Sequence, residues 1–220
     1  MKDKLIKYLT EFITDNRIKR FNEIIQYRTR YITVVLEDIF QPHNASAVLR
    51  SCDCFGVQDV HIIENKNKYN INPDVALGSN KWLNLLKYNK EKNNTVDAIK
   101  KIKSKGYRII ATTPHNNSVN LDEFDIEKGK IALLFGTELN GLSNEALDYS
   151  DEYLKIPMYG FTESLNISVS TAIILKSLIY KLHHSEIQWA LSEEEMTNLK
   201  LKWLKNSIKN SELLIKKFNK

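Results

Sequence analysis

This chain of 220 residues lacks the segments that mark several classes of protein. It has no apolar run near the roughly 20 residues of a membrane-spanning helix, and its first residues, MKDKLIKYLTEF, lack the apolar core of a secretory signal. Its two cysteines, Cys52 and Cys54, are one residue apart, which fits neither a disulfide framework nor a CxxC metal or redox motif. We therefore expect a soluble cytoplasmic protein, with no membrane contact and with both thiols reduced and buried.

Motifs for metals and nucleotides are missing as well. No cluster of His, Cys and carboxylates has the spacing of a metal site, so we expect no bound metal. No GxGxxG sequence occurs, and the glycine-rich residues 136–141 are followed by Leu142 where a P-loop requires lysine. The sequence therefore gives no support to a Rossmann dinucleotide site and argues against an NTPase.

Positive charge is present, but it is concentrated at the two ends of the chain. Of the total net charge of +5, residues 1–30 carry +4 and residues 196–220 carry +6, which leaves −5 for residues 31–195. Basic ends on a neutral-to-acidic body suit an enzyme whose terminal segments hold a polyanion. A coding bias that fills solvated helix faces with Lys and Asn explains the same charge equally well.

The hydrophobic content of 42% is enough for a core, and its periodicity predicts alternating strands and helices. Strands are expected at residues 31–36, 60–63, 82–88, 107–112, 131–135 and 153–156. Helices are expected at residues 3–14, 18–28, 44–55, 96–105, 143–147, 167–183 and 192–218. This alternation predicts a parallel sheet with helices on both faces. We divide the chain into an N-terminal helical extension (1–30), one catalytic-size domain (31–184) and a basic C-terminal helical extension (185–220).

Three polar blocks follow predicted strands, where ligands of parallel sheets bind. In the first, Asn44 is a natural helix N-cap, and Arg50 is a cation in an otherwise apolar helix that needs a partner such as a phosphate. The second is a glycine turn with one carboxylate, Glu138. The third places Ser164 and Asn166 at the start of a long helix. Each block alone also fits an ordinary cap, a surface arginine or a failed P-loop.

In their order along the chain, however, the three blocks resemble the SpoU class of SPOUT methyltransferases. The shared pattern is Asn-x5-Arg after the first strand, FG-x-E-x2-G after a later strand, and IPM…SLN-[IV]-S-V-[AS] into the last helix. The stretches EDIFQPHNASAVLRSCDCFGVQDVHII and GSNKW are also similar to the TrmH group of tRNA (guanosine-2'-O-)-methyltransferases. The resemblance covers about residues 15–184.

The resemblance implies a fold, a cofactor and a set of site residues. The fold is a parallel α/β sheet with a deep trefoil knot, which the general rule against knotted chains would not have suggested. The cofactor is S-adenosylmethionine and the assembly is a homodimer. The implied cofactor-binding residues are Thr112, Gly136, Ile156 and Leu165, and the implied catalytic residues are Asn44, Arg50, Glu138, Ser164 and Asn166.

The implied reaction is methylation of a ribose 2'-hydroxyl in RNA. The short terminal extensions favour tRNA as the substrate, with guanosine 18 of the D-loop as the target. Two alternatives stay open: a ribose methylase for rRNA or another tRNA position, and a catalytically silent RNA-binding member of the fold. The basic C-terminal helix could instead bind a protein partner or an anionic membrane surface.

The expected roles of the catalytic residues centre on Arg50. We expect Arg50 to bind the phosphate beside the target ribose, oriented by Asn44 and Glu138, while Ser164 and Asn166 hold the reacting nucleotide. The family proposal also makes the arginine the base that removes the 2'-hydroxyl proton. Because a guanidinium has a pKa of roughly 12 or more, we expect Arg50 to accept this proton only late in the reaction.

Overall fold

The computed structural model describes residues 2–114, 118–137 and 140–218. The chain divides into two compact units, Arg30–Trp189 and a terminal unit that combines Met1–Thr29 with Ala190–Lys220. The three-part domain division expected from the sequence stays a prediction. No helix of the described residues is long and apolar enough to cross a membrane.

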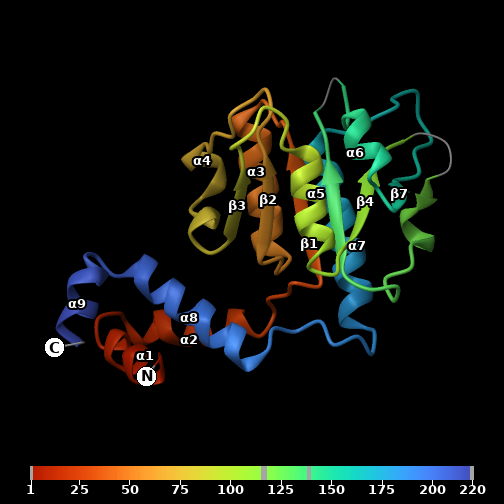
Figure 1. Cartoon of the computed structure of the whole chain (residues 1–220). Coiled ribbons are helices and arrows are strands. Elements are labelled where there is room, and N and C mark those ends of the chain that lie inside the picture. The colour runs from red at the N-terminus through yellow and green to blue at the C-terminus, as the bar shows by residue number, and fades with distance from the viewer. Residues whose placement is uncertain (1, 115–117, 138–139, 219–220) are drawn as a thin grey trace. The chain divides into compact units, whose positions relative to one another are not determined.

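The larger unit is built around a parallel β-sheet (Figure 1). In the described residues seven strands pair in parallel in the order β3-β2-β1-β6-β4-β7-β5. Their bounds are β1 Ile32–Glu37, β2 Asp59–Ile63, β3 Asn84–Tyr88, β4 Arg108–Thr112, β5 Val119–Asn120, β6 Ile131–Phe135 and β7 Glu152–Lys155. The parallel sheet expected from the alternation is confirmed, except that the two-residue β5 was not predicted. The implied knot stays a prediction.

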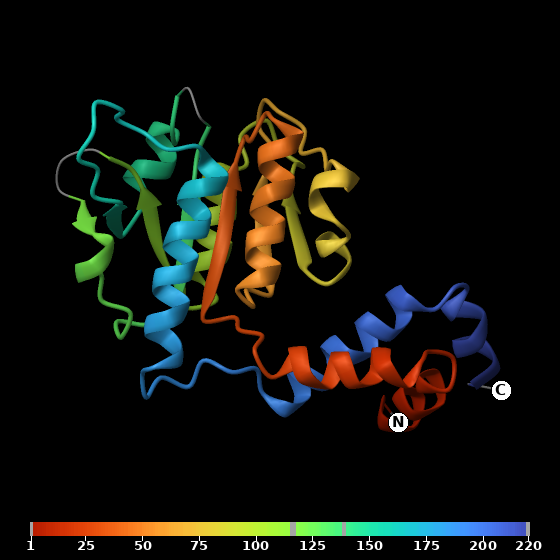
Figure 2. The same cartoon turned by 180° about the vertical axis from the view of Figure 1, so that it is seen from behind.

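Helices cover both faces of this sheet (Figures 1 and 2). Because side chains alternate along a strand, Val34 of β1 packs into the core shared with α3 (Pro42–Cys54) and α7 (Ile167–His183). The next residue, Val35, packs into the core shared with α5 (Thr95–Lys103) and α6 (Asn144–Asp148). Shorter helices complete the unit: α4 Pro73–Ala76, η1 Ser79–Lys81 and η2 Leu121–Glu123.

The helix α3 differs from the prediction at both of its ends. Its N-cap is Gln41, so the expectation that Asn44 caps the helix is wrong. Pro42 occupies the first turn, where its fixed φ and missing N–H are tolerated, and this moves the helix start two residues toward the N-terminus. At the other end Cys52 is buried as expected, but Cys54 is exposed because it lies on the opposite side of the last turn.

The terminal unit is made of four described helices from the two ends of the chain: α1 Lys2–Thr10, α2 Asp15–Ile25, α8 Glu193–Ser207 and α9 Ser211–Phe218. Trp203 of α8 is 1% exposed, with its ring 5.4 Å from that of Phe21 in α2. The single helix predicted over residues 192–218 is wrong, because α8 ends at Ser207 and Asn210 adopts a φ of 59° before α9 begins. The left-handed region interrupts a helix.

Candidate active site

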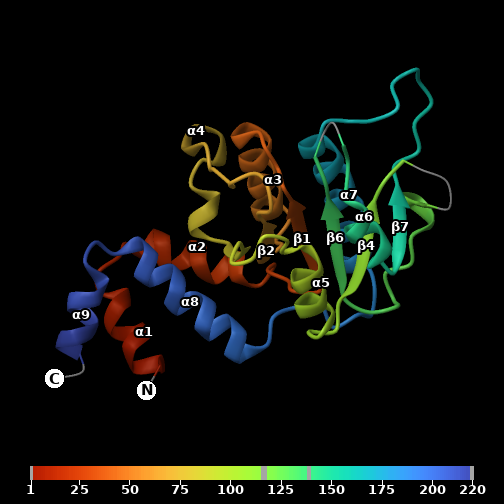
Figure 3. The ribbon, with the colours of Figure 1, turned by 45° about the horizontal axis from the view of Figure 1, so that its top comes forward.

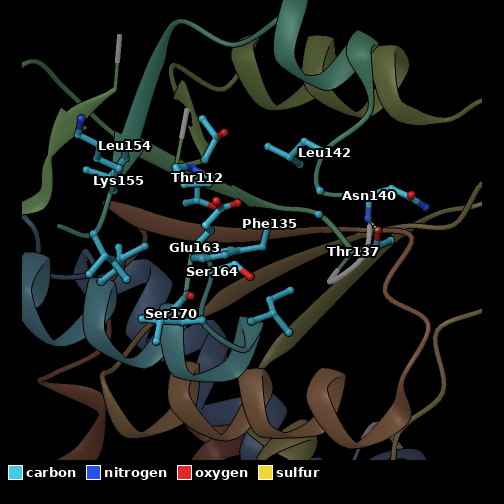
Figure 4. Close-up of a pocket in the computed structure, with 18 of the residues that line it drawn as sticks. Thr112, Phe135, Thr137, Asn140, Leu142, Leu154, Lys155, Glu163, Ser164 and Ser170 are labelled. Atoms are coloured by element: carbon cyan, nitrogen blue, oxygen red, sulfur yellow. Dashed lines mark hydrogen bonds between the residues drawn. The ribbon is translucent and has the colours of Figure 1, made fainter. Parts of the chain in front are cut away.

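A cavity of about 560 Å³ opens at the carboxyl ends of β4, β6 and β7 (Figure 4). Its walls come from the residues that follow each of these strands and from the start of α7. Figure 3, with this edge of the sheet turned forward, shows the long segment between β7 and α7 that extends beyond the strands. The cavity therefore lies where parallel α/β sheets bind their ligands.

The structure brings together most of the residues to which the family resemblance assigns cofactor or substrate contacts. Thr112, Gly136, Ile156 and Leu165 all line the cavity, and Ser164 lines it beside Leu165. These residues come from three separate segments, the ends of β4 and β6 and the connection between β7 and α7, which the sheet places at one edge. Their functional roles stay a prediction that the geometry makes reasonable.

The described residues of the segment after β6 form one wall of this cavity. Thr137 and Gly141 exchange two backbone hydrogen bonds, each 2.9 Å long, and so fold the segment back on itself. A Cβ added to Gly136 would overlap the backbone of Gly141 and Leu142. Only glycine therefore permits this turn, which explains the glycine that the sequence alone placed in a failed P-loop.

Asn44 and Asn166, which are 122 residues apart in the sequence, form a hydrogen-bonded pair. Asn166 donates from Nδ2 to Asn44 Oδ1 over 3.1 Å, and its own Oδ1 accepts the backbone N–H of Ser168 as the N-cap of α7. Asn44 is only 4% exposed and also donates to the Gln41 side chain. The pair thus joins the first turn of α3 to the start of α7, beside Leu165 and Ile167 of the cavity wall.

Arg50 is not part of this arrangement. Arg50 is exposed on α3 and is not among the residues that line the cavity. Six residues of helix separate it from Asn44 by about 9 Å along the axis and place the two on different sides. Glu138 lies outside the described residues. The expectation that Asn44 and Glu138 orient Arg50 therefore stays a prediction.

Few ionisable side chains border the cavity. Among the described residues that line it, the ionisable ones are Glu163 and Lys155. His61 lies elsewhere, in β2, where burial lowers the pKa of its imidazole to about 4 and its Nδ1 is 2.8 Å from the Tyr88 hydroxyl. The described cavity lining thus holds no histidine to serve as a general base. No group of three or more His, Cys, Asp or Glu among the described residues could hold a metal ion.

The sequence missed several side chains of this region. Leu142, Met158 and Asn140 line the cavity, and the sequence singled out Leu142 only because it replaces a P-loop lysine. A second cavity of about 870 Å³ adjoins the first and is lined by Tyr159 and Thr162 among others. The two cavities share five lining residues: Pro114, Lys155, Ile156, Met158 and Glu163. The position of all these residues just after predicted strand ends was the signal that could have found them.

Comparison with known proteins agrees with the geometry. The model of the SpoU rRNA methylase family matches residues 31–176, which include all seven described strands and every residue that lines the cavity. The chain belongs to this family. The resemblance drawn from the three polar blocks is therefore confirmed.

Individual relatives extend the similarity beyond the matched domain. A tRNA (guanosine(18)-2'-O)-methyltransferase from Borreliella burgdorferi is 48% identical over 211 residues, covering 96% of this chain and 94% of that protein. The crystal structure of the A. aeolicus TrmH/SpoU tRNA modifying enzyme has a TM-score of 0.78 and 33% identity, and the match covers 89% of this chain and 98% of that one. AviRb from Streptomyces viridochromogenes, solved in complex with AdoMet, shares the fold with a TM-score of 0.62 at 22% identity, over 74% of this chain and 65% of that one.

Proposed function

We propose that the chain is an enzyme that transfers a methyl group from S-adenosylmethionine to the ribose 2'-oxygen of guanosine 18 in tRNA. The observation that carries this proposal is the 48% identity to the Borreliella enzyme over 96% of the chain. An alignment of 211 residues includes most of the terminal unit as well as the family domain. The likeness therefore includes the helical unit that holds both basic ends, in addition to the cavity.

The residues present fit S-adenosylmethionine. The cavity volume of about 560 Å³ is in the range of small-molecule sites, and its lining mixes apolar side chains with backbone at the turn of Gly136. The backbone and side chains at Thr112, Gly136, Ile156 and Leu165 would hold the cofactor. Glu163 and Lys155 give the lining one charge of each sign, and S-adenosylmethionine likewise carries groups of both signs. When bound, S-adenosylmethionine supplies a methyl group on a positively charged sulfur, which makes the methyl carbon electrophilic.

The protein's own groups then have to position the ribose and allow its 2'-hydroxyl to lose a proton. In the proposed mechanism, Ser164 on the cavity wall and the nearby Asn166 hold the target nucleotide, with Asn166 kept in place by its bond to buried Asn44. Arg50 binds the phosphate next to the target ribose, and this contact aligns the 2'-oxygen with the methyl group to be transferred. Because a guanidinium bound to phosphate is already protonated and has no lone pair, the 2'-hydroxyl proton leaves late, as the new C–O bond forms, to an oxygen of that phosphate or to water, while Arg50 stays a cation. Glu138 is the remaining proposed catalytic residue, with the role of orienting Arg50.

The neighbouring cavity suits the nucleotide side of the reaction. Tyr159 lines it and is almost fully exposed, as is Phe161 in the same segment before α7. Exposed aromatic rings stack on unpaired bases, which is how proteins commonly recognise RNA loops. A D-loop nucleotide placed there would lie beside the cofactor cavity, because the two cavities share wall residues.

We also propose that the enzyme acts as a homodimer in the cytoplasm. Val169 and Ile173, four residues apart on α7, are 45% and 39% exposed and lie on the same side of the helix. A second copy covering this apolar surface would remove it from water. Light scattering of the purified protein measures the assembly directly.

The proposed activity is tested by incubating the protein with methyl-labelled S-adenosylmethionine and an unmodified tRNA transcript. We expect label at the ribose of guanosine 18 and none in a transcript that carries a 2'-deoxy residue there. Label in rRNA, or at another tRNA position, would support the other ribose methylases instead. If S-adenosylmethionine failed to raise the thermal stability of the protein, the catalytically silent alternative would be favoured.

A second prediction concerns the basic terminal unit. Lys209, Lys216 and Lys217 are exposed there, so each is free to contact a phosphate of the tRNA. Changing all three to glutamine is expected to weaken tRNA binding about tenfold at low salt. The slope of log affinity against log salt should become shallower by roughly 0.7 to 0.9 for each lost phosphate contact. Filter binding at several salt concentrations measures both effects.

The matched control also replaces three exposed lysines by glutamine, but in the larger unit. Lys101, Lys105 and Lys128 are exposed lysines of that unit and do not line the cavity. Their replacement by glutamine should leave the salt slope unchanged. Equal losses in both triple variants would show that net charge alone, and not the terminal unit, determines tRNA affinity.

A further inference from the structure

Glu37, the last residue of β1, places a carboxylate where the strand pattern calls for an apolar side chain. Val35, two residues earlier, faces the core shared with α5 and α6, and Glu37 points to the same side of the sheet. The residue is 3% exposed. A carboxylate removed from water in this way is costly unless hydrogen bonds replace its hydration.

Three short hydrogen bonds satisfy this carboxylate, all from neutral donors. Oε2 accepts the backbone N–H of Ser143 over 2.9 Å, and Oε1 accepts the Ser143 hydroxyl over 2.7 Å. Oε1 also accepts the hydroxyl of Thr95 over 2.6 Å. Thr95 is the first residue of α5, and Ser143 is the N-cap of α6, where its Oγ accepts the N–H of Ala146. One buried side chain therefore ties the end of β1 to the starts of two helices.

Ser143, which is bound to Glu37, lies between residues that form one wall of the cavity. Gly136, Gly141 and Leu142 line the cavity before Ser143, and Asn144 lines it immediately after. The beginning of this wall is anchored by β6 in the centre of the sheet, between β1 and β4. Its far end is anchored through Ser143, which does not itself line the cavity. Glu37 lines neither cavity, so it acts on this wall only through Ser143.

We propose that Glu37 is a positioning residue for cofactor binding: its buried carboxylate holds Ser143, and thereby the cavity wall at Gly141, Leu142 and Asn144, in the geometry that accepts S-adenosylmethionine. The proposal rests on the function proposed above for the same cavity. It assigns to Glu37 no contact with the cofactor or the RNA. In this proposal, the end of β1 fixes the geometry of the cavity wall before any ligand binds.

The test is Glu37→Gln, which keeps the shape of the side chain and replaces one acceptor oxygen by an amide that can only donate. With its oxygen toward the Ser143 N–H, the amide turns its NH2 group toward the hydroxyls of Ser143 and Thr95, which must rotate from donating to accepting. The stronger bonds to a charged carboxylate are lost at all three donors. The Kd and the KM for S-adenosylmethionine are expected to rise about tenfold or more, while kcat at saturating cofactor stays within about threefold. Hydrogen exchange without cofactor should be faster at the amides of Ser143 and Ala146.

The matched control is Glu64→Gln. Glu64 is another largely buried carboxylate, with 9% side-chain exposure, and it accepts the backbone N–H of Tyr69 over 2.9 Å. It lines neither cavity. The Kd for S-adenosylmethionine should therefore stay within about twofold of the wild-type value in this variant, even if the thermal stability falls.

Several results would overturn the proposal. A wild-type Kd in Glu37→Gln would do so, and so would an equal loss of affinity in Glu64→Gln. If Glu37→Gln does not fold, Ser143→Ala replaces it, because that variant removes one of the two bonds between these residues; unchanged affinity there would contradict the proposal. Thr95→Val, which leaves both Ser143 bonds intact, should bind the cofactor normally.

The proposed function and the positioning role of Glu37 can be refuted independently of each other. If the wild-type protein does not bind S-adenosylmethionine, the proposed function is wrong. Hydrogen exchange at Ser143 and Ala146 still reports whether Glu37 holds the wall, because that measurement needs no cofactor. Unchanged exchange in Glu37→Gln would refute the positioning role even in an active enzyme.

Discussion

Replacing Arg50 with lysine is expected to lower kcat for tRNA methylation by about 100-fold or more, while the Kd for S-adenosylmethionine stays within about twofold. Arg50 is exposed and does not line the cofactor cavity, so the substitution should not disturb cofactor binding. The loss should appear in turnover, because lysine keeps the charge but not the planar pair of donors that binds a phosphate. Single-turnover methylation and calorimetry measure the two quantities.

The control for this variant is Lys101→Arg, the reverse exchange at an exposed position on α5, which covers the other face of the sheet from α3. Its turnover should equal that of the wild type. Near-normal turnover in Arg50→Lys would contradict the proposed role of Arg50, the phosphate contact that aligns the 2'-oxygen. A weaker affinity for tRNA with normal kcat would reduce its role to binding alone.

Replacing Gly136 with alanine is expected to weaken S-adenosylmethionine binding by about 100-fold and to lower the free energy of unfolding by about 3 kcal/mol. The added Cβ would overlap the backbone of Gly141 and Leu142, and backbone atoms cannot rotate away as a flexible side chain can. The segment must then open, which breaks the paired hydrogen bonds between Thr137 and Gly141 and shifts the cavity wall. Calorimetry and denaturant unfolding measure the effects.

Gly160→Ala provides the matched control for the effect on stability. A Cβ added to Gly160 meets no heavy atom within 4 Å, and its backbone does not require the left-handed region. The free energy of unfolding should therefore change by less than about 0.5 kcal/mol. If Gly136→Ala were as stable as Gly160→Ala and bound the cofactor normally, the close backbone approach at Gly136 would have no part in forming the cavity.

Local patterns in the sequence were sufficient for most elements of the larger unit. The buried strand at residues 131–135 and the helix at residues 167–183 match β6 and α7 to the residue, because continuous apolar runs and helical spacing directly reflect burial. Errors occurred where one residue changed the backbone preference. Pro42 moved the start of α3 away from Asn44, and Asn210 divided a predicted helix into two.

The sequence predicted where the cavity lies, while the roles of its residues stay a prediction. The three segments that carry Thr112, Gly136, and Ile156 with Leu165 gather at one cavity, as expected for loops that follow neighbouring parallel strands. The expected group of Asn44, Arg50 and Glu138 is a different case. The six-residue spacing already indicated that Asn44 and Arg50 lie on different sides of their helix, Glu138 lies outside the described residues, and the joint role of the three stays a prediction.

The sequence by itself determined the parallel α/β class, the strand ends that carry polar residues and the family to which the chain belongs, because these depend on local periodicity and on motifs. Only the tertiary structure decided which distant residues meet. Glu37 and Ser143 are 106 residues apart, and Asn44 and Asn166 are 122 apart. The first contact depends on β6 pairing directly with β1, and the second depends on α3 packing against α7, and no local pattern encodes either arrangement. For the same reason, the packing of the two basic ends into one helical unit could not be derived from either end alone.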